Sequence, residues 1–166
     1  MLRVALPSLA ALAAALVVAA PAAAQEAKAS RLWATINVCD TAKQPHTVGV
    51  RVSMPGAGVR TKQRMYARFR LEFRGDDGAW TAVGPSADSK FIGLGSARVG
   101  ARRSGRSFVL APPDSGAFTF RGEVTFEWRI GDRVIRRVVR RTQAGHPTGT
   151  GDPADFTAAT CRIEAD

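Results

Sequence analysis

Strict alternation of apolar and charged residues over 63–74 constrains the fold of this chain more than any other feature. Met65, Ala67, Phe69, Leu71 and Phe73 fall on one side, and charged residues, mostly arginines, and one tyrosine fall on the other. Successive side chains of a β-strand point to opposite faces of a sheet. The alternation therefore predicts a strand with one face in a hydrophobic core and the other in water.

A second long alternation covers 118–130 and is followed by Gly131-Asp132, a pair typical of a two-residue hairpin turn. Its apolar row, in which Gly122 also falls, comprises Phe118, Phe120, Val124, Phe126, Trp128 and Ile130. The next segment, 133–142, fits an amphipathic helix as well as a strand with a bulge. The hairpin turn and the β-branched residues favour the strand.

Shorter alternating runs between Gly- and Pro-rich turns predict the remaining strands. They lie at 33–39, 47–54, 80–83, 107–111 and 157–163, with a further short strand at 90–94 in a Gly- and Ser-rich stretch over 84–104. About seven or eight short strands and no confident helix predict an all-β protein, an antiparallel β-sandwich.

The first 24 residues have the order of a secretory signal peptide: a positive start at Arg3, an apolar run over 4–20, and small residues up to Ala24. We expect cleavage near Ala24-Gln25 and a mature protein that is secreted, either extracellular or at the cell envelope. The alternative is a retained membrane anchor, because the run approaches the roughly 20 residues that span a bilayer. No second apolar stretch in the mature chain is long enough to do so.

Length and turn composition predict one domain after the signal peptide. Removing residues 1–24 from a chain of 166 leaves 142. Residues 25–31 are predicted to be a flexible N-terminal segment, and residues 32–166 a single β-sandwich domain. Within that domain, the Gly- and Pro-rich stretch 143–158 predicts a mobile loop.

The chain is strongly basic, with a net charge of +10 that becomes +9 when Arg3 is removed with the signal peptide. Only four of its 24 basic residues are lysines, a bias that also fits the codon usage of a GC-rich genome. The charge favours attraction to anionic partners, such as a cell-wall polymer or an acidic extracellular protein. Nucleic acid is not an expected partner, since the exported chain has no nucleic-acid-binding motif.

Two cysteines, Cys39 and Cys161, lie near opposite ends of the mature chain. In an oxidising compartment such a pair predicts one disulfide. Closing a loop of about 120 residues would contribute roughly 4–5 kcal/mol in the chain-entropy model. The alternative, a catalytic thiol, needs a general base, and the only histidines, His46 and His146, lie beside prolines in predicted loops.

No catalytic, cofactor-binding or metal-binding residues are predicted. Gly93–Ala97 lacks the spacing of a nucleophile elbow, and two histidines are too few for a zinc site. The aspartates at 76–77, 152 and 155 fit ordinary turns better than calcium loops. Glu123 and Glu127 share a strand face, as the two carboxylates of a glycosidase do, but Arg121 and Arg129 on the same face favour cross-strand ion pairs.

If the strands at 63–74, 118–130 and 133–141 share a sheet, their polar sides meet in one surface, which we call the arginine face. One interpretation is a docking face for an anionic glycan, a wall polymer or an acidic protein. The other is a solvated sheet face kept soluble by charge. The arginine face comprises Arg64, Tyr66, Arg68, Arg70, Arg74, Arg121 and Arg129, bordered by arginines from the set Arg136, Arg137, Arg140 and Arg141.

Three stretches carry a family resemblance: Val38-Cys39-Asp40, the strand after Arg64-Met65, and residues 128–137. They resemble uncharacterised exported actinobacterial proteins with an immunoglobulin-like or fibronectin type III-like β-sandwich. The chain departs from antibody domains because its cysteines lie much farther apart and Tyr66, its only tyrosine, cannot form a tyrosine corner. The resemblance implies an immunoglobulin-like fold and transfers no catalytic residues.

Together these features predict a secreted, non-catalytic binding module. Two alternatives remain from the residues alone. One is an exported hydrolase or hydrolase inhibitor that works through the 143–158 loop. The other is a structural accessory module that pairs with a partner through an exposed sheet edge.

Overall fold

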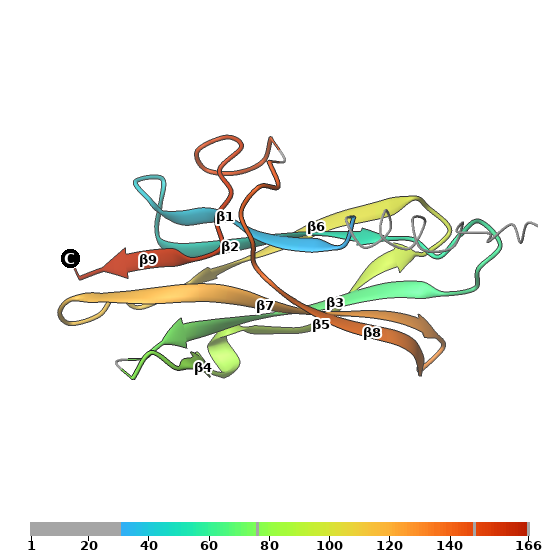
Figure 1. The fold of residues 1–166 in the computed structure, drawn as a ribbon, viewed down its shortest axis with the longest axis horizontal. Helices are drawn as coiled ribbons and strands as arrows, with labels where there is room; N and C mark the ends of the chain where they lie inside the picture. The colour runs from blue at the N-terminus through green and yellow to red at the C-terminus, as the bar shows by residue number, and fades with distance from the viewer. Residues whose placement is uncertain (1–30, 76, 148, 166) are drawn as a thin grey trace, which may run out of the picture.

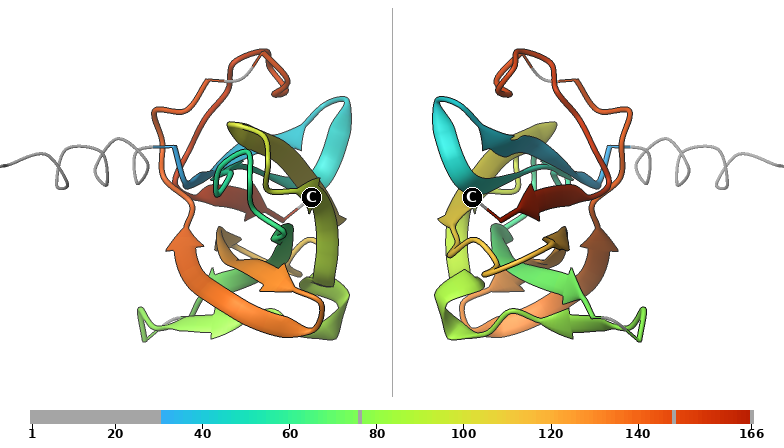
Figure 2. Two further views of the ribbon diagram at one scale, coloured as in Figure 1. Left: turned by 90° about the vertical axis from the view of Figure 1, so that its right-hand side faces the viewer. Right: turned by 90° about the vertical axis from the view of Figure 1, so that its left-hand side faces the viewer.

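Two antiparallel sheets stacked face to face form the protein (Figures 1 and 2). The computed structural model describes residues 31–75, 77–147 and 149–165. Within them it confirms the prediction of an all-β, antiparallel sandwich with one disulfide. The predicted signal peptide, and residues 25–30 of the predicted N-terminal segment, lie outside the described residues.

The smaller sheet, sheet A, has three strands in the order β1-β2-β6. They are β1 (Trp33–Thr41), β2 (Gln44–Pro55) and β6 (Ala101–Val109). The larger sheet, sheet B, has the order β4-β3-β7-β8, with β5 also paired to β3 and β9 to β7. Its strands are β3 (Arg64–Arg74), β4 (Trp80–Ala82), β5 (Asp88–Ser96), β7 (Ala117–Ile130), β8 (Arg133–Arg141) and β9 (Cys161–Glu164).

The core lies between the sheets and is filled by the apolar rows predicted from the alternation. Phe69 of β3, Phe126 of β7 and Val50 of β2 are essentially inaccessible to solvent. The row of β7 is buried only in its middle, because Phe118 and Ile130 lie at the ends of the strand and are 41% and 40% exposed. Trp128 is buried, and its Nε1 donates a hydrogen bond to the Pro55 carbonyl at 3.1 Å.

The strand predictions were least accurate over 84–111. β5 covers Asp88–Ser96, and β6 begins at Ala101, six residues before the predicted strand at 107–111. The first residues of β6 have no apolar alternation because β6 is an edge strand, exposed along most of its length. Its pairing with β2, which runs from Thr47 opposite Val109 to Pro55 opposite Ala101, forms the strand instead.

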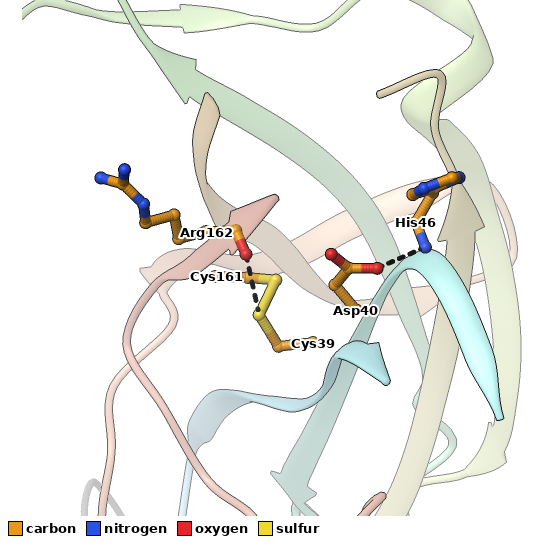
Figure 3. Close-up of a disulfide and its surroundings, with 5 residues drawn as sticks. All are labelled: Cys39, Asp40, His46, Cys161 and Arg162. Carbon is orange, nitrogen blue, oxygen red and sulfur yellow. Dashed lines mark hydrogen bonds between the residues drawn. A yellow bond between two sulfur atoms is a disulfide. The ribbon is translucent and has the colours of Figure 1, made fainter. Parts of the chain in front are cut away.

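The predicted disulfide joins Cys39 of β1 to Cys161 of β9 and therefore links sheet A to sheet B (Figure 3). The two Cα atoms are 5.4 Å apart, and 122 positions separate the cysteines in the sequence. Beside the bond, the Asp40 carboxylate accepts the backbone N–H of His46 at 2.7 Å (Figure 3). A catalytic thiol is excluded, because both cysteines are consumed in the bridge.

The stretch 143–158 rises above sheet A and returns along β1 (Figure 1). Backbone hydrogen bonds hold it there: Gln143 N–H to Ala34 O at 2.8 Å, and a reciprocal pair between Ala158 and Ile36 at 3.0 Å. Its last residues make only that single bridge with β1, so the final strand begins at Cys161 and not at the predicted residue 157. The mobility of this loop stays a prediction.

Candidate functional site

The arginine face predicted from the sequence exists as one surface, the outer face of sheet B. The antiparallel register of β3 and β7 places Arg64 opposite Arg129, Arg70 opposite Glu123, and Glu72 opposite Arg121. β8 continues the surface, since Arg137 lies opposite Glu127 and Arg141 opposite Glu123. All seven predicted residues thus project from the same side of the sheet.

Glu127 lies at the centre of this surface and is fully buried. Its carboxylate accepts hydrogen bonds from two arginines, Arg129 on its own strand and Arg137 on β8, each at an N–O distance of 2.5 Å. The Arg129 guanidinium also lies 4.5 Å from the ring centroids of both Tyr66 and Phe91. Two cations therefore bond one carboxylate, and one of these cations also lies against two aromatic rings.

Two further carboxylates, Glu123 of β7 and Glu72 of β3, lie on the same surface. Glu123 is bonded by Arg70 and by Arg141, the latter at 3.3 Å. Arg141 also approaches Glu72 at 3.5 Å, and Arg121 bonds Glu72 at 2.6 Å. The Arg121 guanidinium lies 4.1 Å from the ring centroid of Trp80 on β4.

Asp88 of β5 completes the set and is shared by Arg68 and Lys90, the latter at 3.1 Å. The hydrogen bond from the Arg68 guanidinium holds the pKa of Asp88 well below its usual range. The same bond raises the pKa of Arg68. Both groups are therefore charged throughout the physiological pH range.

These contacts form what we call the arginine network, in which every carboxylate is bonded by two cationic groups. Seven cations against four carboxylates leave a net charge of +3. The cations are Arg68, Arg70, Lys90, Arg121, Arg129, Arg137 and Arg141, and the carboxylates are Glu72, Asp88, Glu123 and Glu127.

The structure confirms the cross-strand ion pairs predicted for Glu123 and Glu127 but corrects their environment. Both were expected on a face exposed to water, and both are buried. The reason is that the long arginine side chains lie over the carboxylates and cover them, with their methylene stems contributing apolar surface.

The remaining predicted arginines lie outside the network. Arg64 is exposed at one end of β3, and Arg74 at the other end donates to the Gly78 carbonyl at 3.4 Å. Arg136 and Arg140 lie on the opposite side of β8, since they pair with the core residues Trp128 and Val124. The Arg136 guanidinium lies 4.7 Å from the ring centroid of Trp128.

Four participants were missed by sequence reasoning: Trp80, Asp88, Lys90 and Phe91. They come from β4 and β5, whose pairing with β3 brings them to its outer face. No local sequence pattern predicts that β4 and β5 contribute to this face. The two strands are short or contain glycine, and their apolar residues do not alternate clearly.

Neither histidine joins the arginine network. His146 stacks on Trp33 with 4.8 Å between ring centroids and an interplanar angle of 6°, and burial lowers its pKa. Asp77 accepts the backbone N–H of Ala79 within its turn, as predicted for a turn aspartate, and Asp155 accepts the backbone N–H of Gly149, six residues earlier. No three His, Cys, Asp or Glu side chains within 31–75, 77–147 and 149–165 are grouped to hold a metal ion.

A helix long and apolar enough to cross a membrane does not occur in the part of the chain that the structure describes. No protein-family model, curated protein or solved structure showed significant similarity to the chain. The immunoglobulin-like resemblance therefore stays a prediction.

Proposed function

We propose that this protein is a secreted, non-catalytic binding module whose arginine face docks onto an anionic polymer of the cell envelope. The single observation that supports this function is the sharing of each carboxylate in the arginine network by two cations. A solvated face of balanced ion pairs would be close to neutral. The arginine network instead retains a net positive charge after each carboxylate has been set against one cation.

The shared carboxylates also fix the arginines in place. A guanidinium has five N–H donors, so an arginine that gives one or two to a buried carboxylate keeps others for a ligand. Arg137 and Arg141 retain 60% and 54% of their side-chain exposure. Because these side chains are already ordered, binding an anion costs less conformational entropy than it would for free arginines.

The test measures binding of the mature protein, from Gln25 onward, to isolated cell envelope over a series of salt concentrations. We expect binding at low salt that weakens steeply as salt screens the surface charges. The test variant is Arg137→Gln/Arg141→Gln, in which Glu127, Glu123 and Glu72 each keep one arginine partner. Loss of both exposed cations should weaken binding by about tenfold or more.

The matched control is Arg102→Gln/Arg103→Gln, which removes the same charge from exposed positions on β6 of the other sheet. It should weaken binding less than about twofold. Equal loss in the two double variants would show that net charge alone acts, and would overturn the assignment to this face. Absence of binding at low salt would overturn the function itself.

A further inference from the structure

The two edges of sheet A differ in how far the rest of the chain covers them. β1, at one edge, is partly covered by the 143–158 stretch, which bonds to the backbone of Ala34, Ile36 and Asn37. β6, at the other edge, pairs with β2 and with no other strand that the structure describes. Its other side is therefore an unpaired strand edge within the described chain, and the strand is exposed along most of its length.

Two hydrogen bonds fix which backbone groups lie on this free side. Gly56 N–H donates to the Gly100 carbonyl at 3.0 Å just before β6, and Leu110 N–H donates to the His46 carbonyl at 2.9 Å just after it. In an antiparallel ladder, successive residues direct their backbone groups alternately toward the partner strand and away from it. The even-numbered residues of β6 therefore direct theirs at β2. The free side receives those of Ala101, Arg103, Gly105, Ser107 and Val109.

Of the devices that protect strand edges from pairing with other chains, β6 has only charge. The strand is nine residues long and contains no proline. It pairs with β2 in one unbroken register, without a bulge. Its positive charge comes from three exposed residues, Arg102, Arg103 and Arg106. The backbone geometry of β6 would therefore allow a further strand to pair along it, provided that its charge suits these arginines.

The three arginines have no ion-pair partner among the described residues, in contrast to the arginines of the network on sheet B. Arg102 and Arg106 lie opposite the core residues Met54 and Val50, so they project from one side of β6 and Arg103 projects from the other. A second copy of β6 would bring like charges together, which is destabilising. An acidic strand would instead bring carboxylates to unpaired guanidinium groups.

We propose that the free edge of β6 binds an extended, acidic peptide segment of another protein, which adds to sheet A as a fourth strand. Backbone hydrogen bonds to Arg103, Gly105 and Ser107 hold the peptide. Carboxylates four residues apart along it lie beside Arg102 and Arg106, which are separated by about 13 Å of strand. The site is independent of the proposed function, because the arginine face belongs to sheet B and strand addition requires no envelope polymer.

The test uses a synthetic peptide of nine residues, the length of β6, with glutamate at every fourth position, threonine midway between the glutamates, and valine at the alternate positions. Fluorescence anisotropy measures its binding to the folded mature protein, and NMR measures backbone amide exchange. We expect saturable binding in the millimolar range or tighter. Amide exchange at Arg103, Gly105 and Ser107 should become slower in the complex. Absence of saturable binding, or binding that leaves these amides unprotected, overturns the proposal.

Control peptides separate strand addition from simple attraction between charges. Replacing glutamate with glutamine should weaken binding by about tenfold or more. When the glutamates lie beside Arg102 and Arg106, the valines direct their N–H groups at β6 and the threonines direct theirs away. N-methylation of the valines should therefore abolish binding, whereas N-methylation of the threonines should change it by less than about twofold. Equal binding of the two methylated peptides would show attraction by charge alone and overturn the proposal.

A backbone variant locates the edge. Ser107→Pro removes one N–H on the free side and leaves the hydrogen bonds to β2 in place, in a position where a strand edge tolerates proline. It should weaken peptide binding by about tenfold. Ser107→Ala keeps the N–H and should leave binding unchanged, and thermal unfolding verifies that both variants fold. Equal binding by the two folded variants contradicts strand addition.

Charge variants test the same edge without touching the backbone. Arg102→Gln/Arg106→Gln should weaken peptide binding by about tenfold or more. The matched control is Arg137→Gln/Arg141→Gln, which removes the same charge from the arginine face and should weaken peptide binding by less than about twofold. Peptide binding that depends on the arginine face as much as on β6 overturns the assignment to this edge.

Discussion

The outer faces of the two sheets both carry arginines, but these arginines differ in the hydrogen-bond partners that the protein supplies to them. On sheet B, Arg129 and Arg137 share the buried Glu127, and every carboxylate of the network has two cationic partners. On sheet A, Arg51 has a buried Nε with no acceptor among the described residues. The comparison shows that the cross-strand neighbour decides the role of a strand arginine: glutamates face β3 and β8 arginines, whereas Gly105 faces Arg51.

Breaking the covalent link between the two sheets should have the largest effect. Cys39→Ala/Cys161→Ala opens a loop with a sequence separation of 122, and the chain-entropy model gives a loss of roughly 4–5 kcal/mol in unfolding free energy. Urea denaturation measures it. A loss below about 1 kcal/mol would show that the sheets are held together almost entirely by their core.

Removing the central carboxylate of sheet B should have the next largest effect. Glu127→Gln leaves Arg129 and Arg137 without their shared anion, and we expect a loss of about 3 kcal/mol, since buried ion pairs that lose one partner are strongly destabilised. Glu164→Gln is a suitable control, because that carboxylate is 70% exposed. Equal stability changes in both variants would contradict the central role of Glu127.

The same kind of change on sheet A should have a much smaller effect, of opposite sign. Arg51→Met removes an unsatisfied donor and keeps the apolar stem, so we expect a change between zero and a gain of about 1 kcal/mol. Thermal unfolding measures it. A loss above about 2 kcal/mol would mean that Arg51 has a partner in the free protein, and would remove the contrast between the two faces.

The smallest effect is a pH dependence of the unfolding free energy, which should come from His146, stacked on Trp33 of sheet A. Burial lowers the pKa of His146 in the folded protein, so its contribution to stability is complete above the unfolded pKa of about 6.5 and is lost as pH falls below that value. His146→Phe keeps an aromatic ring against Trp33 and should remove this dependence. Stability profiles measured from pH 5 to 8 that are identical in the two proteins would exclude the effect.

Much of the fold could be predicted because apolar alternation is local. The rows of β3 and β7 were found from their own residues, as was the hairpin at Gly131-Asp132. β6 was predicted six residues short because its first half, an exposed edge, is formed by backbone pairing with β2 and leaves no apolar pattern. The candidate site was predicted to the same extent: its arginines were found, but the aromatic and acidic partners from β4 and β5 were not.

The sequence by itself determined which faces of the strands are apolar, which residues make up the arginine face, and that two distant cysteines would pair. Only the tertiary structure decided that Glu127 is buried, that each carboxylate of the network has two cations, and that the Arg51 Nε has no acceptor among the described residues. The physical reason is that the direction in which a side chain points follows from the two-residue period of its own strand. Its burial and its charge partners depend on register with strands up to tens of residues away.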